Sequence, residues 1–273
     1  MPSEHHYHAE EKQYPSASAF LSQYSRQLRR PAFRRVSSSA IKAVAPELGN
    51  VAIDFILQKI AEAGEGCVSS SDIFLHAFTN ISSRMYYTAR KSNPRCPPSR
   101  LPRDIQISLP SSSSSPSAPC PTHVLAVYSS PSALAKQRVS LYSVHALILA
   151  ATCSNLPPLA YSKASVHSGT ATVPVVPLCI SSPEMFGVLL EYLYTFDTDT
   201  LIRSLLPVSN SGGPLPPPEV MAKHLKANPM AIQGCLSRIY GLYNDICALG
   251  VFDEKLWRAM EASWEVCWTA LGV

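Results

Sequence analysis

The chain has 273 residues, a formal net charge of +4 and only 15% charged residues. This length allows one or two domains that bury a full hydrophobic core. No apolar run approaches the roughly 18–20 residues that span a membrane, and the polar N-terminus lacks the pattern of a secretory signal. We therefore expect a soluble protein that does not enter a membrane.

The charge is divided unevenly along the chain. Residues 1–110 contain 14 Lys or Arg and 9 Asp or Glu, whereas the remainder is nearly neutral. A neutral surface with few charges favours protein–protein contact over nucleic-acid binding. None of the eight cysteines forms a C-x-x-C pair, so we expect reduced core thiols in an intracellular protein.

The first segment, residues 1–39, is predicted to be a disordered basic tail. It contains a run of arginines, namely Arg26, Arg29, Arg30, Arg34 and Arg35. Pro31 interrupts the run, so a long regular helix is not expected there. The arginines predict a nuclear import signal or an arm that contacts phosphates. A plain solvated tail is the alternative.

A helical hairpin is predicted for residues 40–91 and a linker for residues 92–121. Apolar residues recur at three- and four-residue spacing in two stretches of the first segment. The second segment is rich in proline and serine, so it cannot bury enough apolar area to offset its ordering entropy. Within it, Ile105 and Ile107 would suit a short edge strand.

A core of strands and helices is predicted for residues 122–206. Two alternating segments, 123–129 and 138–142, suggest an antiparallel hairpin, and the apolar helix Val144–Ala151 follows. Thr170–Ile180 is extended, but its two prolines predict an edge strand or only partial pairing.

The C-terminal part is predicted to be helical. The amphipathic helix Glu184–Tyr194 and a flexible loop at 207–218 precede apolar stripes that indicate helices in Pro229–Leu249 and after Asp253. The last helix contains all three tryptophans, Trp257, Trp264 and Trp268. They form a packed core face or a partner-docking face, and the core interpretation is preferred.

The motifs of catalytic and metal sites are missing from the sequence. There is no G-x-S-x-G, no phosphate-binding glycine loop, no H-E-x-x-H and no Cys/His cluster with zinc spacing. His145 lies in an apolar helix, where a core role is expected. We therefore expect no enzyme activity, no cofactor and no metal. No predicted helix is basic on one face, so direct nucleic-acid binding is not expected outside the arginine run.

The segments VHALILAATCS and PLCISSPEMFGVLLEYLYT resemble a degenerate BTB/POZ domain. In that family a His-x-x-x-Leu-Ala helix follows a hairpin, and a strand leads to a helix that ends in Tyr-x-Tyr-Thr. The matching positions include His145, Leu149, Phe186, Leu190, Tyr192 and Tyr194. The resemblance implies a BTB-like core with a helical extension in residues 122–273. The expected fold is α+β and mainly helical, with a small sheet.

The segments PLCISSPEMFGVLLEYLYTFDTDTLIRSLLP and IYGLYNDICALGVFDEKLWRAMEASWEVC resemble the clampless-type proteins of basidiomycete fungi. This resemblance spans about Val124–Ala270. It implies a developmental regulator of clamp-cell formation and dikaryon maintenance. Such a regulator is expected to act in the nucleus, downstream of the mating-type homeodomain factors. The family supplies no catalytic residues to transfer.

We therefore predict a non-enzymatic nuclear regulator that binds other proteins. Mating-type homeodomain factors are the partners that the resemblance implies, and homodimerisation is a further expectation. The first alternative is a BTB-type adaptor that recruits substrates to a cullin ubiquitin ligase. The second is a DNA-binding factor that uses the basic N-terminal arm, whose binding would depend steeply on salt.

Overall fold

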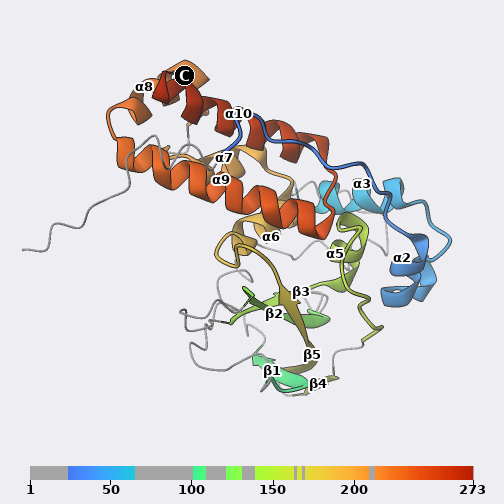
Figure 1. Cartoon of the computed structure of the whole chain (residues 1–273). Coiled ribbons are helices and arrows are strands. Elements are labelled where there is room, and N and C mark those ends of the chain that lie inside the picture. Colours follow the sequence, from blue (N-terminus) through green and yellow to red (C-terminus); the bar gives the residue numbers. More distant parts are fainter. Residues whose placement is uncertain are drawn as a thin grey trace, which may run out of the picture.

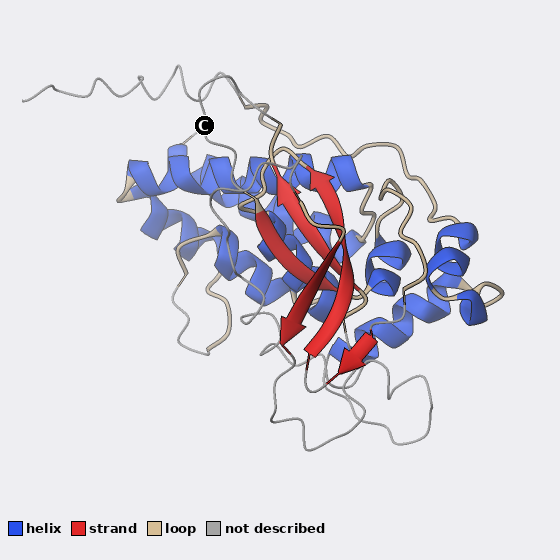
Figure 2. Ribbon diagram, turned by 90° about the horizontal axis from the view of Figure 1, so that it is seen from below, coloured by secondary structure: helices blue, strands red, loops and turns tan. Residues whose placement is uncertain are grey.

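A computed structural model describes residues 24–64, 101–108, 121–130, 139–162, 165–167, 170–208 and 213–272. A small mixed sheet lies at one end of the molecule, and the helices gather over one of its faces (Figure 1, Figure 2). The fold is α+β and mainly helical, which confirms the predicted class. Within the described ranges, no helix is both long enough and apolar enough to cross a bilayer.

Among the described residues, helices precede and follow the strands, and α5 lies between β3 and β4. The helices are α2 (Ser38–Val44), the 3-10 helix η1 (Pro46–Leu48), α3 (Ile53–Gly64), α5 (Ala146–Thr152), α6 (Phe186–Thr195), α7 (Thr198–Leu205), α8 (Pro218–Lys226), α9 (Pro229–Leu249) and α10 (Glu254–Leu271). The strands are β1 (Asp104–Ser108), β2 (His123–Tyr128), β3 (Ser140–Val144), β4 (Ser165–His167) and β5 (Thr170–Cys179).

The sheet has the strand order β1-β5-β2-β3, and the short strand β4 also pairs with β5. β2 and β3 form the predicted antiparallel hairpin, with Leu125 opposite Tyr142. β5 pairs antiparallel with β1 and β4 and parallel with β2. Parallel pairing requires a crossover, and the chain from β3 through α5 and β4 provides it.

β5 contains two prolines and still lies between two strands of the sheet. Residues 170–174 pair with β1, and residues 175–179 pair with β2. Pro177 lies opposite Ala126 of β2, beyond the part of β5 that β1 reaches. At Pro177, β5 pairs with β2 alone, so no second neighbouring strand needs the N–H that proline lacks. β5 is thus partly paired, as its prolines predicted, but it is not an edge strand.

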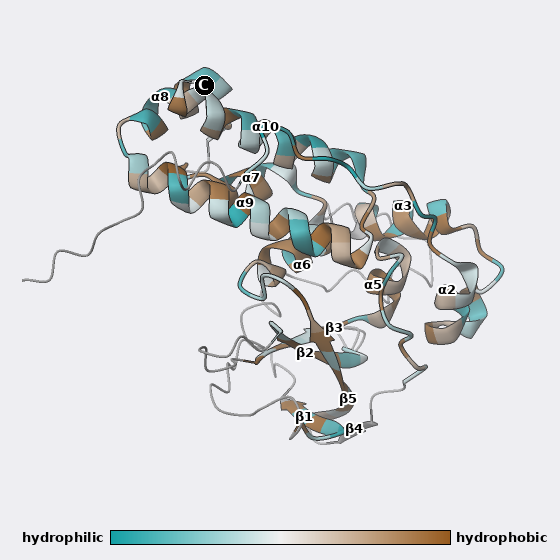
Figure 3. Cartoon of the chain, in the orientation of Figure 1, coloured by the Kyte–Doolittle hydropathy of each residue, from teal (hydrophilic) through white to brown (hydrophobic). Residues whose placement is uncertain are grey.

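The two faces of β2 contribute to two hydrophobic clusters. Leu125 and Val127 join the main core under the helices, whereas Val124 packs with Ala171 and Val173 in a small cluster. This is the alternation that the two-residue period of a strand imposes. Figure 3 shows that β2, β5 and α5 are mostly apolar, while α8 and α10 also carry hydrophilic residues.

The N-terminal helices cover one side of this core. The first predicted helix of the hairpin is divided into η1, which Pro46 begins, and α3, and the short helix α2 precedes them. α2 packs on α5, and α3 packs on α5 and α6. The second predicted helix of the hairpin lies outside the described residues. β1 falls within the predicted linker 92–121, where an edge strand was expected.

The turn between α9 and α10 joins the C-terminal helices to α5. Gly250 ends α9 in the left-handed conformation with φ 65°, and the Val251 amide donates to the Ile246 carbonyl at 3.1 Å. Ser154 donates to the Gly250 carbonyl through its amide at 3.1 Å and through its hydroxyl at 3.0 Å. A Cβ on Gly250 would collide with the Ser154 hydroxyl, so the turn requires glycine.

Asp245 is a buried carboxyl group on α9. Its Oδ1 accepts a hydrogen bond from the Ser182 amide at 3.0 Å, while its Oδ2 has no hydrogen-bond partner in the described part of the chain. Burial raises the pKa of Asp245 to about 7 from its ordinary value near 3.8, and the nearby Glu184 carboxylate adds to the rise. This bond holds α9 against the turn that precedes α6.

The variant Gly250→Ala is predicted to lower the free energy of unfolding by more than about 2 kcal/mol. The methyl group would be strained at positive φ and would displace Ser154. The matched control is Gly234→Ala on the same helix, where an added Cβ meets no atom within 4 Å. That change should stabilise by up to about 1 kcal/mol. Urea unfolding of both variants checks this, and equal effects would contradict the role assigned to Gly250.

Asp245→Asn is predicted to flatten the pH dependence of stability. The folded protein keeps its Asp245 proton up to about pH 7, whereas the unfolded chain loses it near 3.8. The wild type therefore loses stability as pH rises between these values, by up to about 1.4 kcal/mol per pH unit. The stability of the variant relative to the wild type should rise across this window and level off above it. Urea unfolding at pH 5, 6, 7 and 8 measures the difference, and a constant difference would show that Asp245 does not titrate in this window.

Candidate functional site

Residues Tyr24–Val36, here called the arginine arm, lie along α10 and α9 (blue trace beside α10 in Figure 1). The arm contains no helix or strand, in keeping with Pro31 within it. It runs antiparallel to α10, since Arg26 pairs near the C-terminal end of the helix and Arg30 pairs nearer its start. From Tyr24 onward, the predicted tail is therefore docked on the protein.

The surface that receives the arm combines carboxylates with aromatic rings, and we call it the α9–α10 face. Its residues are Glu254, Trp257, Glu261, Trp264, Glu265 and Trp268 of α10 and Tyr240 and Tyr243 of α9. The α10 members recur at steps of mainly three and four residues, so they project from one side of the helix. The three glutamates were not among the residues predicted from the sequence, although they lie three or four residues from the tryptophans.

Ion pairs hold two arginines of the arm. Arg26 Nη2 lies 2.8 Å from Glu265 Oε1. Arg30 makes two contacts with Glu261, at 2.7 and 2.8 Å, and a third with Glu254 at 2.6 Å. Hydrogen bonding to Glu261 raises the pKa of Arg30, and hydrogen bonds from Arg258 and then Arg30 lower the pKa of Glu254. The bidentate pair gives the contact a defined geometry.

The same two arginines also lie over indole rings. The Arg26 guanidinium is 5.4 Å from the centre of the Trp268 ring, and that of Arg30 is 5.8 Å from Trp257. These distances are within the range of cation–π attraction. The ring of Tyr24 packs edge-on against Trp264 at 5.8 Å. Each arginine therefore contacts both a carboxylate and an aromatic ring.

The other predicted arginines are held less firmly. Arg35 lies 3.6 Å from Asp54, and both side chains are largely exposed. The side chains of Arg29 and Arg34 form no ion pair with another described residue. The structure therefore divides the predicted import run into two arginines that pair with carboxylates of α10 and three that do not. Whether the run directs import stays a prediction.

The three tryptophans predicted for partner docking or core packing lie beneath the arm. Trp257 and Trp264 are 2% exposed and Trp268 is 5% exposed. The Trp264 indole N–H donates to the Arg26 carbonyl at 3.1 Å, so the arm itself occupies this surface. The Trp268 indole N–H has no acceptor among the described residues. The tryptophans are thus buried, and they also contact a docked segment, but that segment belongs to this chain and not to a partner.

The residues assigned to a BTB-like core are all buried, namely His145, Leu149, Phe186, Leu190, Tyr192 and Tyr194. The Tyr194 hydroxyl accepts from the His145 amide at 2.9 Å and lies 3.0 Å from His145 Nδ1. The Tyr192 hydroxyl donates to Asp253 Oδ1 at 2.5 Å. These contacts fit the expected core role of His145 and join α5, α6 and α10. The BTB-like resemblance itself stays a prediction.

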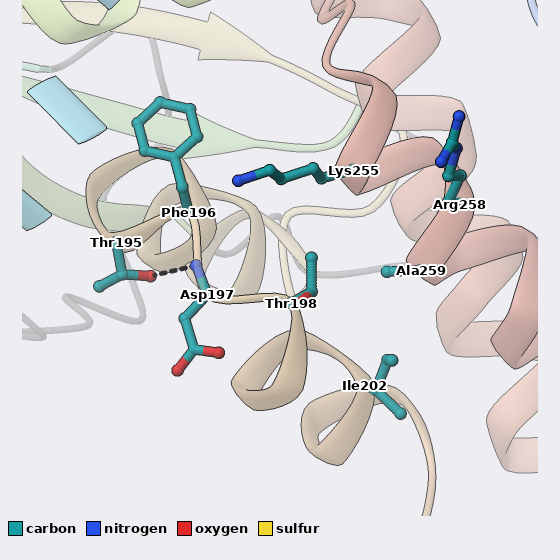
Figure 4. A pocket seen from close by; sticks show the side chains of 8 residues that line it. All are labelled: Thr195, Phe196, Asp197, Thr198, Ile202, Lys255, Arg258 and Ala259. Carbon is teal, nitrogen blue, oxygen red and sulfur yellow. Dashed lines mark hydrogen bonds between the residues drawn. The ribbon is translucent and has the colours of Figure 1, made fainter. Parts of the chain in front are cut away.

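An open cleft of about 740 Å³ lies between the α6–α7 turn and the start of α10. Figure 4 shows Lys255 reaching across it toward Phe196. The Asp197 carboxylate is occupied in capping α7, where it accepts from the amides of Asp199 and Thr200. The cleft is therefore lined by the cations Lys255 and Arg258, whereas the Asp197 carboxylate is used to cap α7.

A second cavity of about 430 Å³ lies between the end of the arm, α3 and the α9–α10 turn. Its lining includes Phe33, Leu57, Leu193 and Val251, with Arg34 and Lys255 among its charged residues. Phe196 borders both hollows and ends α6 in the left-handed conformation, with φ 52°. This lining is mixed in chemistry and contains no nucleophile paired with a base.

The cysteines within the described ranges form no disulfide; they are Cys153, Cys179, Cys235, Cys247 and Cys267. Arg238 Nη2 lies 3.3 Å from Cys235 Sγ. A hydrogen bond from Cys267 and the Arg238 charge lower the pKa of Cys235 to about 7, although burial opposes the shift. The described residues contain no group of three side chains suited to a metal ion.

Comparison with known families gives two matches. A model described as the Clampless protein 1 N-terminal domain matches residues 31–181, and a model described as the Clampless protein 1 C-terminal domain matches residues 199–273. No curated protein and no solved structure matches the chain. The first model alone covers more than half of the sequence, and the α9–α10 face lies within the second. The chain therefore belongs to the clampless protein family.

Proposed function

We propose that the chain is a non-enzymatic nuclear regulator of fungal sexual development, which acts in clamp-cell formation and dikaryon maintenance. The observation that carries the proposal is the match of both clampless models, which leaves only residues 1–30 and 182–198 uncovered. A family named for the loss of clamps supports a role in forming them. The regulator acts by binding other proteins, with mating-type homeodomain factors as the first candidates.

The arginine arm supports a role in protein binding rather than in phosphate contact. Arg26 and Arg30 already have carboxylate partners on the α9–α10 face. A DNA phosphate would have to displace those carboxylates before it could use either arginine. A DNA-binding role is therefore the weaker alternative, and the cullin adaptor is the alternative that partner identification tests directly.

Affinity purification of the tagged protein from dikaryotic cells is predicted to recover homeodomain or other transcription factors, identified by mass spectrometry. This result is expected because the family match indicates a role in clamp formation. A parallel purification of the tag alone is the control. Recovery of cullin or ubiquitin-system subunits instead would favour the adaptor, and recovery of neither class would reject both proposals.

Replacement of Arg26, Arg29, Arg30, Arg34 and Arg35 by alanine is predicted to abolish nuclear accumulation of the tagged protein. The change removes every arginine of the run that a receptor for basic segments would contact. Fluorescence microscopy measures the ratio of nuclear to cytoplasmic signal. The control is Lys223→Ala/Lys226→Ala on α8, which should leave the ratio unchanged. An unchanged ratio in the arginine variant would reject the import function.

A further inference from the structure

The arginine arm contacts the α9–α10 face in two similar steps. At the first step Arg26 meets the Glu265 carboxylate and the Trp268 ring. At the second step, four residues later, Arg30 meets the Glu261 carboxylate and the Trp257 ring. Each step offers an aromatic face and a carboxylate to one guanidinium, and the second step adds the Glu254 carboxylate, so the spacing of the two steps matches arginines four residues apart.

The face also contacts the main chain of the arm. The Trp264 indole donates to the Arg26 carbonyl at 3.1 Å, and the Tyr243 hydroxyl donates to the Arg29 carbonyl at 2.9 Å. Main-chain carbonyls are common to all sequences, so these bonds hold an extended segment whatever its intervening side chains are. Together the contacts have the chemistry of a surface that binds extended peptides.

The arm is held more weakly than the helices beneath it. Its ion pairs join side chains that are about 36% to 59% exposed, and exposed pairs contribute about 0–1 kcal/mol each. The face has its own packing, because Trp264 also stacks with Tyr240 and packs edge-on against Trp268. Tyr24 and Leu28 of the arm also pack against the core, but both stay partly exposed, so the arm can leave without unfolding α9 or α10.

We propose that the α9–α10 face is a docking surface for an extended segment of a partner protein that carries two arginines four residues apart. The chain's own arginine arm is the built-in competitor. This inference rests on the proposed function as a protein-binding regulator and names the chemistry of the partner. Docking of the partner displaces the arm, so it also releases Arg26 and Arg30 into the exposed basic run.

A partner is a better occupant than the arm of a second copy. The attached arm has an effective concentration of about millimolar, and the same arm from another copy makes the same contacts. Exchange between copies therefore gains nothing at lower protein concentrations. A partner segment can instead carry residues beyond the two arginines that make contacts the arm lacks.

The test uses the full chain and a fluorescein-labelled peptide with the sequence of residues 24–36. The variant Arg26→Ala/Arg30→Ala removes the anchors of the arm and leaves the face intact. The matched control, Arg29→Ala/Arg34→Ala, removes the same charge from arginines that pair with no described carboxylate. Trypsin cleavage after Arg29 in the anchor variant reports release of the arm independently of peptide binding.

Fluorescence anisotropy should show the peptide binding the anchor variant at least about tenfold more tightly than the wild type, where the attached arm competes. Adding Glu254→Gln, Glu261→Gln and Glu265→Gln to the anchor variant should weaken binding by about tenfold or more. A peptide that lacks the exposed Gln27, and so has its arginines three residues apart, should bind the anchor variant more weakly than the native peptide. Trypsin should cleave the anchor variant faster than the wild type.

Equal binding to the wild type, the anchor variant and the arginine control would overturn the proposal, as would no binding to any of them. Equal binding of the two peptides would overturn the role of arginine spacing. Dimers of the wild type at the same concentration would overturn the choice of a partner over a second copy. These measurements use purified protein. They can contradict the docking proposal even when nuclear accumulation and partner recovery support the proposed function. They can also support docking when those two experiments contradict the proposed function.

Discussion

The turn between α9 and α10 carries contacts on which both halves of the molecule depend. Asp253 accepts hydrogen bonds from the Leu256 amide at 2.7 Å and from the Tyr192 hydroxyl at 2.5 Å. The first bond caps α10 and the second joins that cap to α6 in the core. The helical period places Glu254, Trp257 and Glu261 on one side of α10, and the Tyr192 bond fixes the start of that helix against α6. The α9–α10 face is therefore oriented by a contact in the core.

Local patterns predicted much of this fold. The Asp253 cap and the apolar stripe of the last helix were readable, because capping and helical period act over a few residues. The β2–β3 hairpin was readable for the same reason. The first predicted helix shows where this reasoning failed, since the apolar spacing from Leu48 to Ile60 predicted one helix and the structure has a break between η1 and α3. The prolines of β5 predicted the partial pairing that the structure has, but not the central position of the strand, because its pairing partners are not encoded in its own residues.

The candidate site lay beyond local reasoning because its partners are far apart in sequence. Arg26 and Glu265 are separated by 239 positions, and Arg30 and Glu261 by 231. The charge count showed an excess of basic residues in the N-terminal part of the chain and a nearly neutral C-terminal part. It could not show that glutamates in the last helix neutralise two of those arginines. The tryptophan spacing predicted that these residues share one side of the helix, but only the folded chain shows that the arm covers them.

The chemistry of the arm contact explains why such a surface would be controlled by its own chain. A segment buried in the main core, such as α6 with Leu190 at 2% exposure, leaves only by unfolding the protein. The arginine arm is held by exposed ion pairs and ring contacts, whose strength depends on salt, on modification and on competing charges. On this scale, the docked and released states differ by about a few kcal/mol in free energy. The binding of one protein partner can supply a difference of this size. The fold thus combines a permanent core with one segment whose position can respond to a binding partner.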